Sequence, residues 1–374
     1  MKGRHDAKRR RFLKSAVIGG AAAGTVAASG FPAPAIAQDR REWKMVTAWP
    51  KGLPGVGTGA EKIARRITDM SGGRLTVKVY AGGEIVPPLE VFSAVAEGKA
   101  EMGHDASYYH IGKHRQTAFF TTVPFGLTAN EMSAWIHWGG GQELWDELYA
   151  GFGLKPFLAG NTGTQMLGWY KRELKTADDY KSLKVRMAGL GGEVVKKLGA
   201  TVVVVPASEI FQSLQNGTVD AAEWTGPYND QSLGLNQVAE YYYGPGFQEP
   251  SAALELLVNR KLYDELPDDL KAIVAAAAQA AHDDMWAEYA LRNGEALASM
   301  ISKGVKVARV PNELMVALGT ASGEVLAEER EKADAIGKKI FASFLKARSP
   351  LSAYTRIGEQ AMANARALAY KYIE

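Results

Sequence analysis

An arginine and a glutamate stand near the ends of two expected strands, where they could hold a charged ligand. Arg186 comes late in the apolar run Leu183–Ala188, and Glu223 closes the run Val219–Glu223. Ligands of open α/β sheets bind at the carboxyl ends of the strands, and a guanidinium can hold a carboxylate through two charge-assisted hydrogen bonds. We therefore predict an anion site here. The alternatives are an internal ion pair for Arg186 and a helix cap or an inter-strand pair for Glu223.

A second polar segment, Gly160–Tyr170, joins two expected strands through amides and small residues. Its amide side chains include those of Asn161 and Gln165. This composition differs from that of an ordinary surface turn. We interpret the segment as a polar crossover between two lobes, which would lie beside the cleft that separates them.

The glycine-rich segment Gly55–Ala60 matches the G-x-G-x-x-A fingerprint of dinucleotide-binding proteins. The acidic residue expected at the end of the next strand is absent, because that strand ends at Val79–Ala81, and a second run, Gly189–Val194, lacks the last glycine. We interpret both runs as tight turns and helix starts near a ligand. An exported NAD(P)-dependent oxidoreductase that uses Gly55–Ala60 is the alternative function. A sugar-binding protein of an ATP-driven importer is a third candidate, but Arg186 beside Glu223 favours an anion.

Three histidines, His104, His110 and His114, lie close together in the sequence. His110 and His114 could share a helix face, but no H-E-x-x-H spacing completes a zinc site. We expect these histidines to be surface residues or hydrogen-bonded core residues. The chain has no cysteine, which excludes disulfides, thiolate metal sites and a cysteine nucleophile.

Residues 1–37 have the pattern of a twin-arginine export signal. The run Arg9–Lys14 is followed by the mildly apolar stretch Ser15–Gly30 and by Ala35–Ala37, an A-x-A cleavage site. A membrane anchor is the alternative, but the glycines of the apolar stretch suit it poorly. The signal carries seven of the 44 basic residues and one of the 41 acidic residues, so the mature chain has a net charge of −3. The net positive charge that would favour nucleic-acid binding is therefore absent from the mature chain.

Strand-like and helix-like segments alternate along the mature chain, which is typical of α/β sheets covered by helices. The expected strands are Trp43–Trp49, Leu75–Tyr80, Glu101–Ala106, Leu154–Gly160, Gln165–Lys171, Leu183–Ala188, Thr201–Val205, Val219–Glu223, Ala253–Val258 and Val305–Val310. The expected helices are Ala60–Ser71, Pro88–Gly98, Gly192–Leu198, Ser208–Gln215, Asp268–Ser302, Asn312–Arg348 and Leu351–Ile373.

The length of the mature chain predicts two domains. The expected helix Asp268–Ser302 would span about 50 Å, enough to cross both lobes. The C-terminal helix carries apolar residues that either pack on a lobe or form a dimer contact. The predicted division is lobe I at 38–160 and about 250–285, lobe II at 161–249 and about 303–345, part of the lobe-spanning helix at about 286–302, and a C-terminal helix with a possible role in dimerisation at 350–374.

Four short motifs carry a family resemblance: Asn161–Met166, Lys184–Arg186, Glu223–Tyr228 and Tyr241–Gly246. They resemble the solute-binding subunits of tripartite ATP-independent periplasmic (TRAP) transporters, in particular the branch that binds 2-oxo acids and related hydroxy acids as cation complexes. The resemblance implies a two-lobed periplasmic-binding-protein fold in which helices flank a mixed sheet in each lobe. It also implies a periplasmic protein without enzymatic activity that delivers a small carboxylate to TRAP membrane subunits.

The resemblance also implies roles for individual residues. Arg186 would hold the substrate carboxylate, while Gln165, Glu223 and Glu249 would bind a cation through side-chain oxygens. Trp224 would add its backbone carbonyl to the cation and its ring to the ligand. The other implied substrate-binding residues are Asn161, Tyr108 and Tyr109.

We have two further expectations, one for the cation and one for the pocket wall. Glu223, Glu249, Arg186 and a monocarboxylate leave two negative charges in the cleft, so we expect Ca²⁺ or Na⁺ with an all-oxygen ligand set and no organic cofactor. Phe247–Gln248 departs from the aromatic pair of similar proteins at this position. That departure leaves the size of the substrate open.

Overall fold

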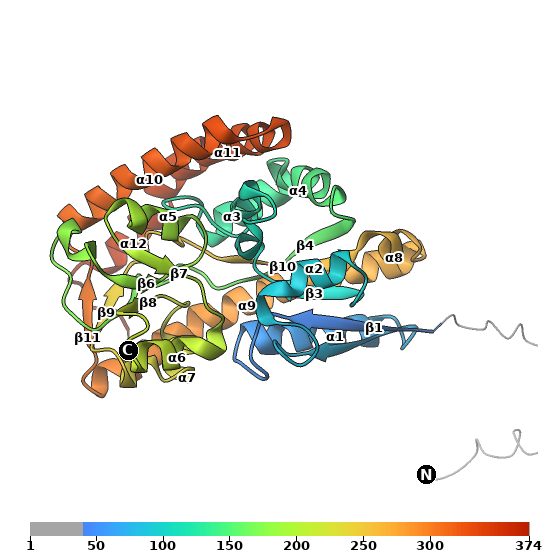
Figure 1. Ribbon diagram of the computed structural model, residues 1–374, viewed down its shortest axis with the longest axis horizontal. Coiled ribbons are helices and arrows are strands. Elements are labelled where there is room, and N and C mark those ends of the chain that lie inside the picture. The colour runs from blue at the N-terminus through green and yellow to red at the C-terminus, as the bar shows by residue number, and fades with distance from the viewer. Residues whose placement is uncertain (1–39, 374) are drawn as a thin grey trace, which may run out of the picture. The chain divides into compact units, whose positions relative to one another are not determined.

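The computed structural model describes residues 40–373, which belong to one compact unit (Figure 1). Residues 1–39 and Glu374 lie outside the described residues, so the predicted export signal at residues 1–37 is not tested. Two mixed sheets flanked by helices form the framework, as predicted. The residue boundaries proposed for the two lobes stay a prediction.

The first sheet has the strand order β2-β1-β3-β10-β4. Strands β1, β2 and β3 are parallel, whereas β10 is antiparallel to both β3 and β4. Trp43 and Met45 lie on one face of β1 and share a buried cluster with Ile63 and Ile67, one turn apart on the covering helix α1. The elements of this part are β1 Arg41–Thr47, α1 Val56–Met70, β2 Leu75–Tyr80, α2 Val91–Ala96, β3 Met102–Asp105, α3 Ala129–Trp138, α4 Gly141–Ala150, β4 Leu154–Asn161, β10 Ala253–Asn259 and α8 Arg260–Asp264.

The second sheet has the strand order β11-β9-β5-β8-β6-β7. The tyrosine run of β9 alternates between its faces: Tyr242 stacks on Trp169 with ring centroids 4.1 Å apart, while Tyr241 and Tyr243 stack on each other. Its elements are β5 Gly168–Tyr170, β6 Lys184–Arg186, α5 Gly189–Lys197, β7 Thr201–Val203, α6 Ala207–Gln215, β8 Ala221–Ala222, α7 Pro227–Ser232, β9 Tyr241–Gly244 and β11 Lys306–Arg309.

Two crossover segments, residues 162–167 and 245–252, connect the sheets side by side. The Gln165 amide donates to the Glu249 carbonyl at 3.1 Å, and the Gly246 amide donates to the Gln165 carbonyl at 2.8 Å. The Gln165 backbone pairs with the other crossover and the Met166 amide donates to the Thr225 carbonyl, so β5 is shorter than the predicted strand Gln165–Lys171.

The helix α9 spans Asp268–Ser302, as predicted from its Ala-rich sequence without internal proline. It contacts β4 and α1 of the first sheet and α7 beside the second sheet. Gly59 of α1 lies so close to α9 that a Cβ there would be 2.3 Å from the methyl carbon of Met285. The Gly55–Ala60 run thus serves close helix packing.

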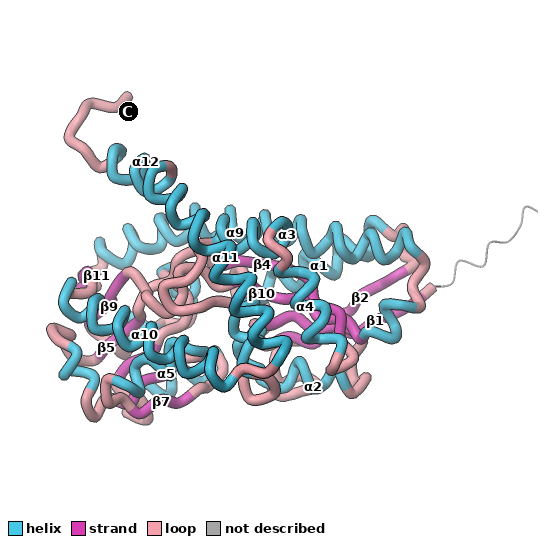
Figure 2. Tube along the Cα trace, turned by 90° about the horizontal axis from the view of Figure 1, so that it is seen from above, coloured by secondary structure: helices cyan, strands magenta, loops and turns pink. Residues whose placement is uncertain are grey.

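The C-terminal region differs from the prediction, which divided it at Pro350. The helix α10 (Asn312–Lys332) ends early because Asp334 caps a new helix, α11 (Ala335–Ile357), by accepting from the Gly337 amide at 2.8 Å. Pro350 lies inside α11. A short helix, α12 (Glu359–Arg366), follows, and this last part extends away from the rest of residues 40–373 (Figure 2).

Candidate functional site

Arg186 lies at the end of β6 and is fully buried. Its Nε donates to the Val205 carbonyl at 3.2 Å, and its Nη1 donates to the Glu223 carbonyl at 2.8 Å. Its Cζ lies over the Trp224 ring, 5.2 Å from the ring centroid. Its Nη2 has no hydrogen-bond partner, so one donor of the fork is available to a ligand.

Glu223 follows β8 and is fully buried beside Arg186. Its Oε1 accepts from Arg186 Nη1 and from the Ala188 amide, the latter at 3.0 Å. The internal ion pair considered for Arg186 is therefore present. It leaves Glu223 Oε2 without a partner, so the pair is not self-contained.

The crossovers add further buried polar atoms without hydrogen-bond partners. Such atoms cost free energy unless something else satisfies them. Among the described residues thirteen buried side-chain atoms lack a partner, and eight of them belong to this small set of residues: Asn161 Nδ2, Gln165 Oε1, Arg186 Nη2, Glu223 Oε2, Trp224 Nε1, Gln248 Oε1 and both carboxylate oxygens of Glu249. Their concentration here indicates a ligand site.

Tyr108 and Tyr109 approach from the first sheet on the 3₁₀ segment Ser107–His110. Their rings contact each other, with centroids 4.8 Å apart. Tyr108 packs on Gly189, the first residue of α5, where a Cβ would lie 3.2 Å from the Tyr108 ring. Burial raises the pKa of Tyr109 to about 12 and that of Tyr108 well above its usual value, so both hydroxyls are protonated and can donate.

The electrostatics of the site are dominated by two buried carboxylates and one guanidinium. Burial raises the pKa of Glu249 well above its usual value, and the charge of Glu223 raises it further. Burial also raises the pKa of Glu223, against the opposing effect of Arg186. A bound cation would compensate the negative charge of the second carboxylate. The unpartnered oxygens of Gln165, Glu223 and Glu249 are the hard donors that Ca²⁺ and Na⁺ prefer.

Two further residues near this site were not among the predicted ligand residues. Trp49 follows β1, and its ring centroid lies 6.1 Å from that of Trp224 and 6.4 Å from that of Tyr109. Its position at the carboxyl end of a strand was the available signal. Gln248 donates to the Met166 carbonyl at 2.8 Å, and the sequence marked it only as part of the departure Phe247–Gln248 in the pocket wall.

The three histidines do not share a site. His104 accepts from Trp49 Nε1 at 2.8 Å, and burial lowers its pKa to about 4. His110 contacts Asp105 at 2.8 Å, whereas the partially exposed His114 contacts Asp334 at 3.3 Å. Their expected status as hydrogen-bonded residues is confirmed.

Comparison with known proteins decides the family. Residues 46–332 match the family model DctP, described as bacterial extracellular solute-binding protein, family 7. The chain belongs to this family. It is a solute-binding protein of the TRAP type, and the alternative of an oxidoreductase using Gly55–Ala60 is wrong. The predicted location outside the cytoplasm is confirmed by the family, and no helix of the described residues is long and apolar enough to cross a membrane.

Three similar proteins extend the comparison. A monocarboxylate 2-oxoacid-binding periplasmic protein of Nostoc sp. is 42% identical over 322 residues, which cover 86% of this chain and 88% of the relative. A TRAP solute-binding protein of Bordetella bronchiseptica, a mixed-occupancy dimer with copurified calcium and picolinate, has a TM-score of 0.86 at 37% identity over 87% of this chain and 97% of that one. A TRAP solute-binding protein of Pseudoalteromonas atlantica with bound sodium and pyruvate has a TM-score of 0.84 at 39% identity over 87% and 99%.

Proposed function

We propose that this TRAP solute-binding protein binds a small 2-oxo or 2-hydroxy monocarboxylate, such as pyruvate or lactate, together with Ca²⁺ or Na⁺, and delivers it to the membrane subunits. The observation that carries this proposal is the division of the unpartnered atoms into two chemical groups. Arg186 Nη2, Asn161 Nδ2 and Trp224 Nε1 are donors, whereas the oxygens of Gln165, Glu223 and Glu249 are acceptors. The donors suit a carboxylate and the acceptors suit a cation.

Each predicted residue has a role in this proposal. Arg186 and Asn161 donate to the ligand carboxylate, and Tyr108 and Tyr109 donate from the side of the first sheet. The Trp224 ring packs against the ligand.

The cation would be held by side-chain oxygens of Gln165, Glu223 and Glu249 and by the Trp224 carbonyl. It would supply the positive charge that two carboxylates and an anionic ligand require in a buried site. The proteins of B. bronchiseptica and P. atlantica hold calcium and sodium, respectively, together with a small carboxylate.

Capture by hinged closure fits the arrangement of the site. The proposed ligand residues come from both sheets and from the two crossovers between them. If the parts joined by the crossovers separate, the site opens, and closure buries the ligand for transfer.

The function is tested by calorimetric titration of residues 38–374, unfolded and refolded to remove carried-over ligand. The panel contains pyruvate, longer 2-oxo acids, lactate and an aromatic acid, each with Ca²⁺, with Na⁺ and with neither. We expect micromolar, cation-dependent binding of at least one acid. No binding by demonstrably folded protein would contradict the proposal.

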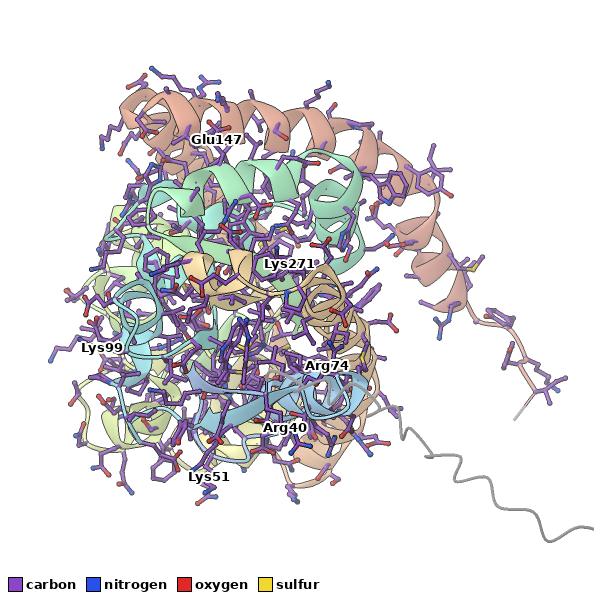
Figure 3. The ribbon with its side chains drawn as sticks, turned by 90° about the vertical axis from the view of Figure 1, so that its right-hand side faces the viewer. Arg40, Lys51, Arg74, Lys99, Glu147 and Lys271 are labelled. Atoms are coloured by element: carbon purple, nitrogen blue, oxygen red, sulfur yellow. The ribbon has the colours of Figure 1, made fainter. Side chains whose placement is uncertain are left out.

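We further propose a homodimer that uses the C-terminal segment. Tyr354, Ile357, Leu368 and Tyr372 are 68–83% exposed. Thr355 and Glu359 hydrogen-bond to α3, and Figure 3 shows that the part beyond them extends away from the remaining described residues. The protein of B. bronchiseptica is also described as a dimer. Removal of residues 350–374 should reduce the native mass in solution to that of a monomer, and an unchanged native mass would refute the role of this segment.

A further inference from the structure

The segment that carries Tyr108 and Tyr109 is bounded by buried ionisable groups that the proposed function does not use. Asp105 ends β3, His110 ends the 3₁₀ segment, and Glu255 lies on β10. Their side chains are 0%, 3% and 0% exposed. Buried ionisable groups are costly, so their presence requires an explanation.

These groups connect both ends of the segment to the first sheet. His110 Nε2 lies 2.8 Å from Asp105 Oδ2 and 3.5 Å from Glu255 Oε1. At the other end of the segment, Ser107 Oγ donates to Glu255 Oε2, which also accepts from the Tyr149 hydroxyl at 2.9 Å. The tyrosines of the candidate site thus lie between two anchored residues.

Glu255 also connects this segment to the crossover that carries Glu249. It is opposite Asp105 in the pairing of β10 with β3, and β10 begins at Ala253, directly after the crossover. One side chain therefore links the segment that carries the tyrosines to the strand that follows a proposed cation ligand.

The cluster is neutral when His110 is in its charged form, with both ring nitrogens protonated, and one of the two carboxyl groups is protonated as well. Although burial would lower the pKa of His110, Asp105 and Glu255 raise it to about 9, while burial raises the pKa of Glu255 to about 7. Asp105 Oδ1 and Glu255 Oε1 have no other partner, and a proton on Glu255 can be donated to Asp105. Tyr149 faces the cluster as a neutral donor, and the neighbouring His104 is directed to Trp49.

The same donor atoms lie within 4.8 Å of one another, as those of a metal site would. Hydrogen bonding accounts for these distances better than a metal ion does. His110 Nε2 lies at hydrogen-bond distance from Asp105, and a ring nitrogen that carries a proton cannot bind a metal. Two protons also balance the two carboxylates without an ion.

We propose that Asp105, His110 and Glu255 are positioning residues that fix Ser107–His110, so that Tyr108 and Tyr109 meet the bound carboxylate. This inference rests on the proposed function. It assigns a role in ligand binding to a cluster that does not touch the ligand. The protonated form of Glu255 is the form that holds the segment in place.

The test compares two variants of Glu255 by calorimetric titration of pyruvate at saturating Ca²⁺. Glu255→Gln keeps an acceptor and a donor, as protonated glutamate does, whereas Glu255→Leu removes both. At pH 6.5 we expect Glu255→Gln to bind like the wild type and Glu255→Leu to bind at least tenfold more weakly. If Glu255→Leu does not fold, Ser107→Ala replaces it, since this change removes only one hydroxyl donor to Glu255, and weaker binding is again expected.

The pH profile separates positioning from general destabilisation. As pH rises from 6.5 to 8.5, Glu255 loses its proton beside Asp105, so wild-type affinity should fall at least threefold relative to Glu255→Gln. Asp230→Asn, which changes a buried carboxylate beside the second sheet, is the matched control and should keep the wild-type profile. Two results together would overturn the positioning role alone. The first is wild-type affinity in Glu255→Leu, or in its substitute Ser107→Ala, and the second is the same pH dependence of affinity in the wild type and Glu255→Gln. Failure of the wild type to bind any acid of the panel would overturn the proposed function and this inference with it.

Discussion

Arg186 is anchored to the protein by two of its nitrogens and has a third that lacks a partner. The anchored atoms fix the plane of the guanidinium, and its Cζ lies over the Trp224 ring. A ligand carboxylate therefore meets a preorganised donor, which reduces the entropy cost of binding. Glu223 is oriented in the same way through one oxygen, with the other left for a cation.

Arg186→Lys should weaken binding of the carboxylate by a factor of ten or more. Lysine keeps a positive charge beside Glu223 but lacks the fork, and a hydrogen bond to a charged group contributes about 1.5–3 kcal/mol. Calorimetric titration measures the loss, and Arg292→Lys at an exposed ion pair with Glu295 is the control that should bind normally. Unchanged affinity in Arg186→Lys would remove Arg186 from the ligand site.

Asp230 should make stability depend on pH. Burial raises its pKa to about 7, although Tyr242, Thr225 and Trp169 donate hydrogen bonds to it. The unfolded chain, where the pKa is about 3.9, loses this proton at lower pH than the folded protein. The contribution of Asp230 to the free energy of unfolding is therefore fully present below pH 4 and is lost as pH rises to about 7.

Asp230→Asn removes this titration while keeping an acceptor. Urea unfolding at several pH values between 4 and 7 should show a flatter dependence of the free energy of unfolding in Asp230→Asn than in the wild type. Parallel pH dependences of the two proteins would mean that Asp230 is ionised throughout this range.

Some residues of the site could be recognised from the sequence because their signals are local. Arg186 and Glu223 stand at strand ends, and Gln165 stands in a polar crossover. Trp49 also follows a strand, and the resemblance marked Gln248 only as a departure in the pocket wall, so neither was assigned to the ligand. Their place at the site depends on how the first sheet and the crossovers meet Trp224 and Met166 in space.

At the scale of elements, α5 begins where the two halves of the site meet. Gly189 has a φ of +61°, and Tyr108 packs directly on it. The backbone conformation and the close contact both favour glycine. The Gly189–Val194 run therefore serves a turn and a close approach, as its interpretation as a tight turn predicted.

Gly189→Ala should destabilise the protein by about 1–2 kcal/mol, because alanine is strained at positive φ. It should also weaken ligand binding, because the added Cβ displaces Tyr108. Gly294→Ala is the matched control: Gly294 is exposed within α9 with no atom near its added Cβ, so we expect unchanged or slightly higher stability. Thermal unfolding and calorimetry check both effects, and normal binding by Gly189→Ala would contradict the placement of Tyr108.

Element prediction succeeded for the long Ala-rich run without proline and failed at several shorter elements, among them α3, α4, α7, α8 and β9. The helix α9 was predicted over its full range. The break between α10 and α11 was missed because Asp334 rather than Pro350 sets it. The helix α3 was also missed, although Glu131 accepts from the Thr128 amide at 2.9 Å and completes a capping pattern visible in the sequence.

At the scale of the whole described molecule, two mixed sheets and two antiparallel crossovers place acidic, basic and aromatic groups around one buried point. The acceptors come from both crossovers and from the second sheet, while the tyrosines come from beside the first. Such a site is complete only when these parts are together. Solute capture and closure are thus expected to be coupled to each other.

The central claim is that carboxylate and cation bind as one unit. The most direct test measures pyruvate affinity at a series of Ca²⁺ concentrations and Ca²⁺ affinity at a series of pyruvate concentrations in refolded protein. We predict that each ligand increases the affinity of the other by the same factor, and that Glu249→Gln reduces this factor while the exposed control Glu265→Gln does not. Pyruvate affinity that is independent of Ca²⁺ and of Na⁺ would contradict the account.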